Sequence, residues 1–592
     1  MSVTTTIVQK PTRVLARAQL HHPKPLFHLT PPQGWINDPC APGFDVATST
    51  YHLSYQWNPY SVEWGNISWG HASSTDGLRW KNSSTQPTMI PDQAYDKEGV
   101  FTGCSWPTGL HGEKGVLTAF YSSITALPHW TWEHKQDSEG VSVATSLDGG
   151  KTWRKSLENP VLQGEPDGLK VTGFRDPFLS YWPALDQALG TEKRLYAALS
   201  GGIVGQGPNV FLYSVNPDDL TSWNYLGPLV DITANTRTGG RWTGELGVNW
   251  ECVNFMTLSD GADAKREVLL LGAESKHIID FRQGQGDEHS GWPLWVAGSI
   301  ETTPIGPRLR HEFDGYLDHG CLYAPNSFEH PVTQKRVAFG WIKEEELTLS
   351  RRAAKGWTGF LSMPRELSLH TTRNVTRGLN SSVESNGSMI IVEDGPCGKI
   401  VQTLGIRPYQ DFRAQPQVHF EEWSNLKDVN GKTARVLTSE TISSSWELEA
   451  TIAVDPSHQR VGFNINSTED GMRGTTIYFD IQNEQIVVDR SLSNREADIK
   501  KYNMSGAFTL YYRRTDSSAT EELEKMRMRI FRDGDTLELF VNDRFALTST
   551  VYAGNDSYAG ICYFAEGGSA KTIAFEKLQL WQLTDKPDDG PQ

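Results

Sequence analysis

Residues 74–80 read Ser-Thr-Asp-Gly-Leu-Arg-Trp, residues 146–153 read Ser-Leu-Asp-Gly-Gly-Lys-Thr-Trp, and a looser copy at 218–223 reads Asp-Asp-Leu-Thr-Ser-Trp. The central aspartates of the three copies are 72 and then 71 residues apart: Asp76, Asp148 and Asp219. In each copy we expect the Asp to lead a tight turn and the Trp to pack back onto the sheet. A supersecondary unit repeated about every 70 residues is typical of β-propeller blades, although chance repetition of common Asp-Gly turns is the alternative.

Short runs rich in β-branched and aromatic residues surround these turns, and helical periodicity is scarce. Each run is bounded by Gly, Pro, Asn or Asp, as strands that end in turns should be. About 350 residues in units of about 70 predict a five-bladed propeller over residues 26–370. The expected strands are residues 51–57, 116–123, 141–146, 194–200, 209–215, 267–273 and 336–342.

The sequence pattern changes near residue 370. Polar residues rich in Asn and Ser indicate a linker over residues 371–410. Residues 411–592 contain a second set of runs that alternate polar and apolar side chains, as in an antiparallel β-sandwich with one solvated face. Residues 1–25 read as an N-terminal extension. The chain is therefore predicted to be all-β, with a propeller followed by a sandwich. The expected sandwich strands are residues 446–454, 460–465, 475–481, 485–491, 526–533, 537–543 and 571–583.

The composition limits the partners. The chain has 592 residues, with 55 Lys and Arg against 71 Asp and Glu, and a formal charge of −16. This acidic balance argues against a nucleic acid or an anionic membrane surface as the main partner. No stretch approaches the roughly 18 apolar residues of a membrane span. The 20 Trp supply flat apolar surface of the kind that sugar ligands often need.

The cysteines and the N-terminus bear on the compartment. None of the six cysteines forms a C-x-x-C pair and no histidine has metal-type spacing, so we expect no metal and no cofactor. No apolar run follows the N-terminal residues as in a secretory signal, so we expect reduced thiols and a cytoplasmic location. Eight N-x-S/T sequons, for example at Asn66, Asn374 and Asn555, leave secretion as the alternative.

Three acidic residues lie among aromatic, Gly or Pro residues instead of in charged runs. Asp38 follows Gly-Trp-Ile-Asn and precedes Pro39, Asp176 follows Phe-Arg and precedes Pro177, and Glu251 lies in Asn-Trp-Glu-Cys. A single Asp-Pro pair most simply caps a strand or starts a turn, because Pro fixes its own backbone and removes a donor. Three such acids in one chain favour a site.

The spacing of the three acids suits a shared cavity. Asp38, Asp176 and Glu251 are 138 and 75 residues apart, which corresponds to about two blades and one blade. The inner strands of a propeller line one central funnel, so all three acids could point into it. Paired carboxyl groups that flank a glycosidic bond are the usual equipment for sugar hydrolysis: one protonates the leaving oxygen, and the other attacks or activates water.

These residues resemble glycoside hydrolase family 32, which contains invertases, inulinases and fungal fructosyltransferases. The run Trp35-Ile-Asn-Asp-Pro39 is similar to the sucrose-binding box of that family. The similarity extends from about residue 26 to residue 583, and the further motifs follow in family order. They are Gln56-Trp-Asn-Pro59, Trp69-Gly-His-Ala72, Phe101-Thr-Gly103, Arg175-Asp-Pro177, Glu251-Cys252, Tyr323-Ala324, the run 356–366, Val488-Asp-Arg-Ser491 and Leu539-Phe-Val-Asn542.

The resemblance implies a five-bladed propeller, a C-terminal sandwich and a retaining double displacement. It implies that Asp38 is the nucleophile, that Glu251 is the acid/base, and that Asp176 binds fructose hydroxyls and stabilises the transition state. Retaining chemistry requires two carboxyl groups about 5–5.5 Å apart, and we predict that separation for Asp38 and Glu251.

The resemblance also implies substrate contacts. Amides and Arg can bridge neighbouring hydroxyls, and aromatic rings can stack on sugar C–H faces. Plain core packing is the alternative for Trp64 and Phe101, and Asp318 and His319 carry a weaker expectation of reaching the glucose side or an acceptor. The residues expected to line the fructose subsite are Asn37, Gln56, Trp64, Phe101, Thr102 and Arg175.

The sequence departs from the common family pattern beside the acids. Cys40-Ala41 replaces the usual Asn-Gly after the box, Cys104 replaces a Ser, and Val253 replaces a Pro. These positions bear on how water competes with a sugar acceptor, and they remove none of the three acids.

The leading interpretation is an enzyme, a β-fructofuranosidase that hydrolyses sucrose through a fructosyl-enzyme, with transfer of fructose to kestose-type oligosaccharides. A dedicated sucrose fructosyltransferase, an inulinase or levanase, and a catalytically silent sugar-binding protein are the alternatives. The expected partners are sucrose and fructooligosaccharides, and the sandwich offers a surface for a homodimer.

Overall fold

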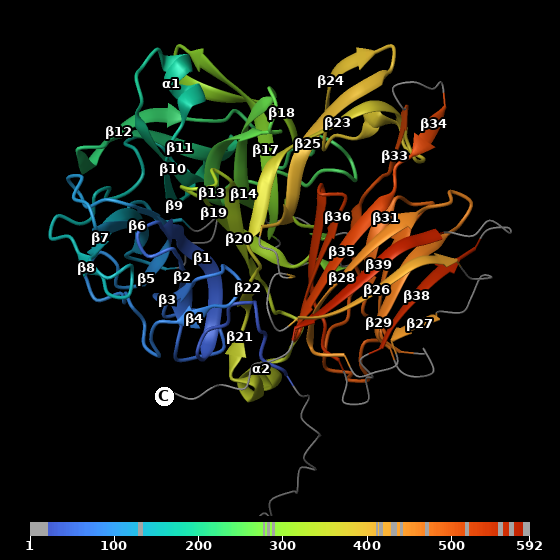
Figure 1. Cartoon of the computed structure of the whole chain (residues 1–592). Helices are drawn as coiled ribbons and strands as arrows, with labels where there is room; N and C mark the ends of the chain where they lie inside the picture. The colour runs from blue at the N-terminus through green and yellow to red at the C-terminus, as the bar shows by residue number, and fades with distance from the viewer. Residues whose placement is uncertain are drawn as a thin grey trace, which may run out of the picture.

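The computed structural model is built almost entirely of β-strands, which form two bodies side by side in Figure 1. Two helices of seven residues each occur among the described residues, α1 (Pro183–Leu189) and α2 (Leu349–Lys355). In the part of the chain that is described, no helix is long and apolar enough to cross a membrane. The structure describes residues 22–127, 134–275, 279–280, 285–286, 291–409, 413, 418–427, 435–438, 442–467, 473–514, 520–553, 560–567 and 574–583.

The first body contains five sheets, which follow one another along the chain as the blades of the predicted propeller; their strands pair antiparallel, except that β21 pairs with β1 in parallel. Blade I has the order β21-β1-β2-β3-β4, blade II β5-β6-β7-β8 and blade III β12-β11-β10-β9. Their strands are β1 (Gly34–Asp45), β2 (Thr50–Asn58), β3 (Ser68–Ser74), β4 (Lys81–Asn82), β21 (Trp357–Thr358), β5 (Gly99–Trp106), β6 (Leu117–Ile124), β7 (Glu139–Ser146), β8 (Arg154–Lys155), β9 (Val171–Tyr181), β10 (Leu195–Ile203), β11 (Gly207–Asn216) and β12 (Asp219–Pro228).

Blade IV has the order β13-β14-β17-β18, and blade V contains β19-β20-β23-β25-β24, with β22 paired to β20. A short hairpin of β15 and β16 lies between β14 and β17 in the chain. These strands are β13 (Asn249–Ser259), β14 (Lys265–Glu274), β15 (Ile279–Asp280), β16 (Gln285–Gly286), β17 (Gly291–Thr303), β18 (Gly306–Tyr316), β19 (Leu322–Glu329), β20 (Arg336–Ile342), β22 (Phe360–Leu361), β23 (Arg365–Gly378), β24 (Ile390–Gly395) and β25 (Gly398–Pro408).

The first strands of the blades form a closed ring, because β1, β5, β9, β13 and β19 each contact the next and β19 contacts β1 again. Each of these inner strands is interrupted by a shift in pairing register, which marks a β-bulge. A bulge bends a strand and re-aims the side chains beside it. One such shift in each strand lies between residues 36 and 39, 100 and 103, 175 and 178, 251 and 254, and 323 and 326.

The repeated Asp-led turns lie where the predicted blades need them. In blades I and II they join the third strand to the fourth, and the carboxylate of Asp76 accepts hydrogen bonds from the backbone N–H groups of Leu78 and Arg79 at 2.9 and 2.8 Å. The Trp after each turn packs on the preceding blade, not only on its own sheet. The ring contacts are Trp80 with Phe339, Trp153 with Trp69, and Trp223 with Phe120. The repeat therefore helps to fasten neighbouring blades together.

The second body is the predicted β-sandwich of two six-stranded sheets, β26-β39-β28-β35-β36-β37 and β27-β38-β29-β30-β31-β32. Burial alternates at the start of β35, where Met526 and Met528 face the core and Arg527 is exposed, as a period of two requires. The strands are β26 (Val418–Lys427), β27 (Arg435–Thr438), β28 (Ser445–Ala453), β29 (Arg460–Ser467), β30 (Thr475–Asp480), β31 (Gln485–Asp489), β32 (Met504–Ala507), β35 (Met526–Asp533), β36 (Thr536–Val541), β37 (Phe545–Thr550), β38 (Gly560–Glu566) and β39 (Ala574–Leu583).

The predicted linker is where the structure differs from the sequence analysis. Residues 371–410 are not an irregular connector, because they contain the end of β23, a 3₁₀ turn (Val383–Ser385), β24 and β25. Two strands from the range assigned to the sandwich also extend this sheet: β33 (Tyr511–Arg514) pairs with β23, and β34 (Glu521–Leu523) pairs with β33. Polar side chains misled the prediction, because backbone pairing holds these strands while only some of their side chains are buried.

The segment before the first blade ties the two bodies together. The carboxylate of Asp533 on β35 accepts hydrogen bonds from the backbone N–H groups of Leu26, Phe27 and His28 at 2.7–2.9 Å. The buried ring of His28 lies between Asp533 and Glu538, at 2.9 and 2.8 Å. Of the predicted N-terminal extension, residues 1–21 lie outside the described residues, and residues 22–25 lead into this strap.

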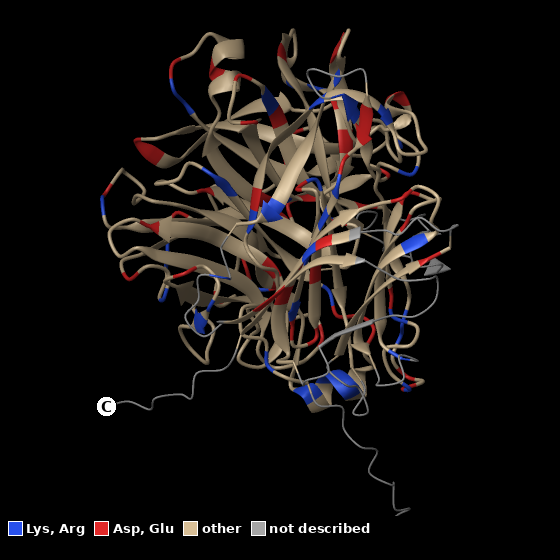
Figure 2. Cartoon of the chain, turned by 45° about the vertical axis from the view of Figure 1, so that its right-hand side comes forward, with Lys and Arg blue, Asp and Glu red and all other residues tan. Residues whose placement is uncertain are grey.

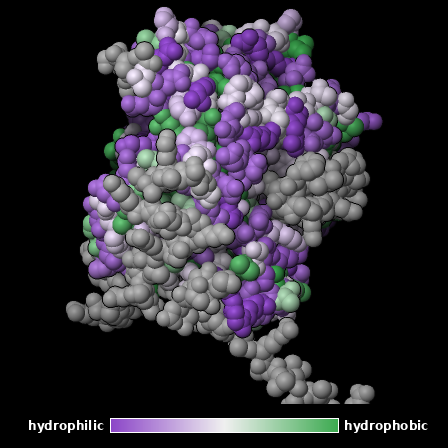
Figure 3. All heavy atoms as spheres, turned by 90° about the vertical axis from the view of Figure 1, so that its right-hand side faces the viewer, coloured by the Kyte–Doolittle hydropathy of each residue, from purple (hydrophilic) through white to green (hydrophobic). Residues whose placement is uncertain are grey.

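The surface is polar and carries mixed charge. In the view of Figure 2, Lys and Arg of the described residues are interspersed with Asp and Glu over both bodies. Among the described residues on the face shown in Figure 3, most are hydrophilic, and hydrophobic residues appear in small scattered groups. A mixed surface of this kind fits the expectation of a neutral small-molecule ligand better than that of a nucleic acid.

Candidate active site

Three inner strands bring the predicted acids together. Asp38 lies on β1 of blade I, Asp176 on β9 of blade III and Glu251 on β13 of blade IV, so the acids are two blades and one blade apart as predicted. Asp38 and Asp176 lie within bulges, and Glu251 stands at the edge of one. The bulge residues Asp176 and Cys252 have φ angles of +61° and +51°, a conformation that costs a non-glycine residue about 1–3 kcal/mol. Two of the strained residues therefore lie where the acids meet.

Asp38 is held as an oriented carboxylate. Its Oδ2 accepts a 2.5 Å hydrogen bond from the hydroxyl of Thr102 and a longer one, 3.4 Å, from the amide of Gln56. Its Oδ1 accepts from the amide of Asn37 at 3.1 Å, and the indole N–H of Trp35 in turn donates to Asn37 at 3.2 Å. Since Gln56 Oε1 also accepts from Asn37, the surrounding amides are fixed in orientation. The carboxylate therefore presents itself in a defined direction.

The charge on Asp38 is costly to maintain. Burial raises the pKa of Asp38 to about 6, the nearby carboxylate of Glu251 adds to the rise, and the hydrogen bonds from Thr102, Asn37 and Cys252 oppose it. Below that pH the group is mostly protonated and is a poor nucleophile. Above it the group is an anion in a site of low polarity, where a developing positive charge would be stabilised.

Cys252, the residue after Glu251, contacts both Asp38 and Asp176. The backbone N–H of Cys252 donates to Oδ2 of Asp176 at 2.9 Å, and the Cys252 thiol lies 3.5 Å from Asp38 Oδ2 and 3.6 Å from Asp176 Oδ2. Burial raises the pKa of Asp176 well above its usual value, Arg175 opposes the rise, and Glu251 and Asp38 add to it. Because the Cys252 thiol lies between the carboxylates of Asp38 and Asp176, these two acids and Glu251, which precedes Cys252, form one compact group.

Glu251 is gripped from two sides. Its Oε1 accepts from Nη2 and Nε of Arg175 at 2.8 and 3.2 Å, and its Oε2 accepts from the hydroxyl of Tyr323 at 2.7 Å. Burial raises the pKa of Tyr323 well above its usual value and the charge of Glu251 adds to the rise, so Tyr323 keeps its proton and stays a donor. The carboxyl side chain remains 19% exposed, so it is open to a ligand.

Two further carboxylates, which the sequence analysis did not identify, complete the group. Glu139 begins β7 and lies 3.0 Å from Nη1 of Arg175, while Glu274 ends β14 and lies 3.1 Å from Nη2. Burial alone would lower the pKa of Arg175, but the charges of Glu139, Glu251 and Glu274 raise it well above its usual value. A lone Glu at a strand end reads as a surface residue, and no local pattern marks either of them.

Most of the predicted fructose contacts lie at this site. Asn37, Gln56 and Thr102 bond to Asp38 directly, and Arg175 bonds to Glu251. Trp64 and Phe101 stand beside them: their rings meet edge to face at 6.0 Å, and Phe101 immediately precedes Thr102. Phe101 is 4% exposed, which fits the alternative of core packing, whereas Trp64 is only half-buried.

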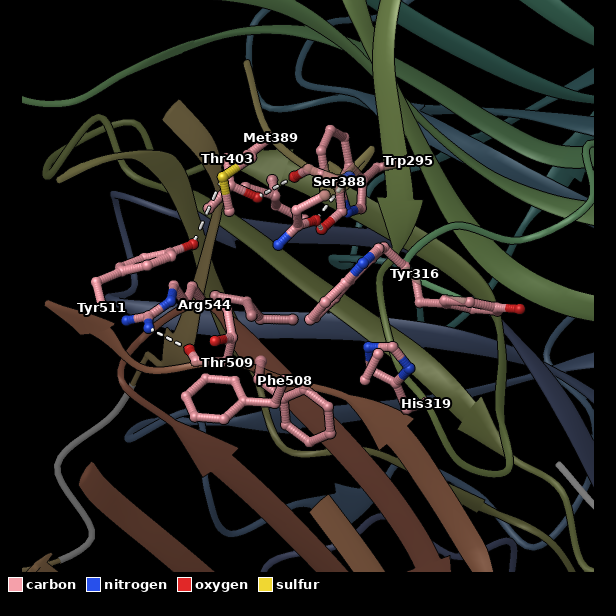
Figure 4. A pocket seen from close by; sticks show the side chains of 16 residues that line it. Trp295, Tyr316, His319, Ser388, Met389, Thr403, Phe508, Thr509, Tyr511 and Arg544 are labelled. Carbon is pink, nitrogen blue, oxygen red and sulfur yellow. Dashed lines mark hydrogen bonds between the residues drawn. The ribbon is translucent and has the colours of Figure 1, made fainter. Parts of the chain in front are cut away.

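Asp318 and His319 are placed elsewhere, and the prediction that they reach the glucose side or an acceptor is wrong. Asp318 is buried and bonds to Arg365 at 2.9 Å and to the hydroxyl of Thr548 at 2.7 Å. His319 stacks on Phe545 at 4.5 Å and lines a cavity of about 40 Å³ between the two bodies (Figure 4). The contacts of Asp318 with Thr548 and of His319 with Phe545 depend on docking of the sandwich, which the local sequence does not reveal.

The tryptophans divide in the same way. The indole N–H of Trp57 donates to the carbonyl of Gln33 and that of Trp250 to the carbonyl of Leu246, and both rings are fully buried in the blade cores. They support the site as packing, not as sugar platforms. Trp35, which contacts Trp341 edge to face at 5.5 Å, and Trp64 are the indoles next to the acids.

Comparison with known families covers both bodies. Residues 28–377 match the model of the glycosyl hydrolases family 32 N-terminal domain, and residues 410–582 match that of the family's C-terminal domain. Together the two matches span the propeller and the sandwich.

Curated relatives are similar at moderate identity. Beta-fructofuranosidase 1 of Zea mays is 30% identical over 382 residues, which are 60% of this chain and 49% of that protein. Acid beta-fructofuranosidase 4 of Arabidopsis thaliana is 24% identical over 575 residues, 94% of this chain and 79% of that protein. A levanase of Bacillus subtilis is 25% identical over 574 residues, 95% of this chain and 71% of that protein. The chain spans about half of the maize relative and of an acid beta-fructofuranosidase of Solanum lycopersicum, 49% and 53% of their lengths.

Solved structures share the whole architecture. A beta-fructofuranosidase of Aspergillus kawachii, solved with glycerol, matches with a TM-score of 0.83 at 26% identity over 94% of each chain. A fructosyltransferase of A. japonicus has the same TM-score at 24% identity over 97% of each chain, a likeness that shows the fold.

Proposed function

Because this chain belongs to glycosyl hydrolase family 32, we propose that it is a β-fructofuranosidase that cleaves sucrose with retention of configuration. The observation that carries the proposal is the meeting of Asp38, Asp176 and Glu251 at the bulges of three inner strands, with Glu251 held between Arg175 and Tyr323. The relatives named above, among them a β-fructofuranosidase and a levanase, support action on fructosides.

The first displacement uses the two partly exposed acids. Asp38 attacks the anomeric carbon of the fructosyl unit, and the bond to the glucosyl oxygen breaks while Glu251 gives its proton to that oxygen. Glucose leaves, and an ester bond joins fructose to Asp38. The hydrogen bonds from Thr102 and Asn37 aim the carboxylate before the substrate arrives, so little reorganisation is needed during the step.

The second displacement reverses the roles of the groups. Glu251, now ionised, takes a proton from water, and the water oxygen attacks the anomeric carbon and releases Asp38. Asp176 contacts the backbone N–H and the thiol of Cys252, beside Glu251. Its carboxylate can stabilise the positive charge that develops on the sugar ring in both steps. The predicted separation of about 5–5.5 Å between Asp38 and Glu251 stays a prediction.

The finer substrate preference is part of the proposal. A second sucrose can replace water in the second step and give a kestose-type trisaccharide, because hydrolysis and transfer share one intermediate. Cys40 and Cys252 stand at positions in contact with Asp38, where a small change alters the approach of the acceptor. A dedicated fructosyltransferase and an inulinase or levanase are the alternatives, and the presence of both catalytic carboxyl groups opposes a silent sugar-binding protein.

The decisive experiment is incubation of the full chain with concentrated sucrose, followed by measurement of free glucose, free fructose and trisaccharide over time. Equal release of glucose and fructose supports hydrolysis, and glucose in excess with trisaccharide supports transfer. Absence of all three, with no fructose released from inulin or levan, would refute the proposed function.

We also propose a homodimer formed through the sandwich. The edge strand β26 exposes Phe420, whose side chain is 47% accessible and packs at 5.2 Å on Trp581. Sedimentation of the wild type and of Phe420→Ser tests this: a dimer that dissociates in the variant supports the proposal, and a monomeric wild type refutes it.

The cytoplasmic location is likewise a proposal. All six cysteines lie in the described part of the chain and are unpaired, as expected of reduced thiols. Two sequon asparagines, Asn386 and Asn466, are only 6% and 8% exposed, and the amide of Asn82 is bonded to the carbonyl of Thr30. Recovery of the protein from culture medium with attached N-glycans would contradict the proposal, and recovery from the soluble cell fraction would support it.

A further inference from the structure

Glu139 is a buried carboxylate that the proposed reaction does not use. It begins β7 in blade II, and its side chain is wholly shielded from solvent. One oxygen lies 3.0 Å from Nη1 of Arg175, and the other accepts a 2.6 Å hydrogen bond from the backbone N–H of Phe174. Both oxygens of Glu139 therefore accept hydrogen bonds from Phe174 and Arg175, the two residues that precede Asp176. Burying a carboxylate without a partner of opposite charge is strongly unfavourable, so buried Glu139 depends on its contact with Arg175.

Arg175 is shared between opposite edges of its guanidinium. Nη1 faces Glu139, while Nε and Nη2 face Oε1 of Glu251 and Nη2 also faces Glu274. These carboxylates come from blade II and blade IV, and Arg175 itself comes from blade III between them. Because the guanidinium is planar and rigid, the grip of Glu139 on one edge fixes the direction in which the other edge meets Glu251.

The charge of Arg175 is divided in the same way. A cation near Glu251 favours the ionised carboxylate, whereas the acid must still carry its proton when the substrate binds. An anion on the far edge of the guanidinium reduces the positive potential that reaches Glu251. We propose that Glu139 is a positioning residue that orients Arg175 toward Glu251 and offsets part of the guanidinium charge. This inference rests on the function proposed above.

Other charged and titratable groups face the same centre and are part of the balance. Glu274 shares Arg175 and accepts from the amide of Asn249 at 2.8 Å. His134 lies 3.6 Å from Glu139 and 3.4 Å from Glu165, so it connects a further carboxylate to the network. The remaining groups are Asp38, Asp176, Cys252, Tyr323 and Lys343, whose ammonium lies 5.4 Å from the centre of the Tyr323 ring.

The test is the pH dependence of kcat/KM on sucrose for the wild type and for Glu139→Gln. Loss of the anion should move the basic limb of the profile to lower pH by about one unit, the lower end of the effect of one neighbouring charge in a buried site. Turnover of a fructoside whose leaving group needs no proton should change much less than turnover of sucrose. Glu267→Gln is the matched control, because Glu267 is buried on β14 and bonds to Trp182 and Thr257 instead of Arg175. The basic limb of the kcat/KM profile of Glu267→Gln should lie at the same pH as that of the wild type.

A basic limb that stays in place in Glu139→Gln, with kcat/KM reduced equally at every pH, would overturn the inference and leave Glu139 a structural residue. If Glu139→Gln does not fold, Glu274→Gln replaces it. This substitution also removes an anion that contacts Arg175, and it is easier to tolerate because the Glu274 side chain is 23% exposed. A fixed limb in that variant would also overturn the inference. Turnover of sucrose by the wild type in the same assay keeps the two conclusions separate: its absence counts against the proposed function, and a fixed limb with turnover intact counts only against the role of Glu139.

Discussion

The hydroxyl of Tyr323 lies 2.7 Å from Oε2 of Glu251, on the opposite side of the carboxyl group from Arg175. Tyr323 comes from blade V and Glu251 from blade IV, so the contact exists only because the inner strands of these neighbouring blades pack together. A carboxyl group that receives donors on both oxygens is fixed in position, and its ionised form is stabilised by both. This contact therefore helps to fix the position of the carboxyl group that we propose as the acid/base.

Tyr323→Phe should move the basic limb of the pH–rate profile to higher pH by about one unit. The removed hydrogen bond stabilises the ionised carboxylate by about 1.5–3 kcal/mol, so its loss favours the protonated form. We expect kcat/KM at the optimum to fall about tenfold, since the carboxyl group is also less well oriented. Tyr196→Phe is a suitable control, because Tyr196 bonds to a different carboxylate, Asp186, at 2.8 Å. A shift in the same direction as Glu139→Gln would contradict the assignment.

Glu251→Gln should reduce turnover of sucrose by about 10²–10⁴-fold, the usual contribution of general acid catalysis. Gln cannot donate a proton to the leaving glucosyl oxygen. The loss should be much smaller on a fructoside with a good leaving group, because departure of that group needs no proton. Steady-state kinetics on the two substrates provide the measurement, and equal losses on both would exclude the acid role.

The acid limb of the profile should lie near pH 6. The pKa of Asp38 is raised to about 6 by burial and by Glu251, and only the ionised form can attack, so kcat/KM should rise as the pH increases through that value. Asp38→Asn removes the nucleophile and should abolish covalent trapping of fructose, which intact-protein mass spectrometry after rapid acid quench can detect. A fructosyl adduct in that variant would refute the role, and so would an acid limb near pH 4 in the wild type.

Docking of the two bodies should weaken at alkaline pH. Burial alone would lower the pKa of His28, but hydrogen bonds to Asp533 and Glu538 and their charges raise it to about 9. The folded state holds this proton more tightly than the unfolded chain, so the stabilisation is complete below about pH 6.5 and is lost as the pH rises through about 9. The full effect is of the order of 3 kcal/mol.

Urea unfolding at pH 7 and pH 10 measures this loss in the wild type and in His28→Gln. The variant should be less stable at pH 7 and should lose less stability on going to pH 10. His330→Gln is the control, because burial lowers the pKa of His330 and so gives it no part in an alkaline transition. Parallel losses in the wild type and in His28→Gln would show that the contact does not couple to pH.

Much of the fold could be read from the residues themselves. The runs 51–57, 141–146 and 526–533 lie in β2, β7 and β35, because alternation of polar and apolar side chains is a local property of strands. The Asp-led repeat likewise predicted the blades, since Asp76 and Asp148 accept backbone hydrogen bonds within their own turns. The polar range 371–410 is not the predicted linker, because side-chain polarity says little about strands held by backbone pairing with one another and with β33.

The sequence by itself determined the blades, the sandwich strands and the identity of the three acids, because period, turn chemistry and the unusual neighbours of Asp38, Asp176 and Glu251 are local. The tertiary structure alone decided which distant side chains meet. The packing of neighbouring blades brings Glu139 and Tyr323 to the two ends of the Arg175–Glu251 pair, and docking of the sandwich gives Asp318 and His319 their contacts with Thr548 and Phe545. Such contacts depend on the positions of whole strands in space, and the spacing of residues along the chain does not predict those positions.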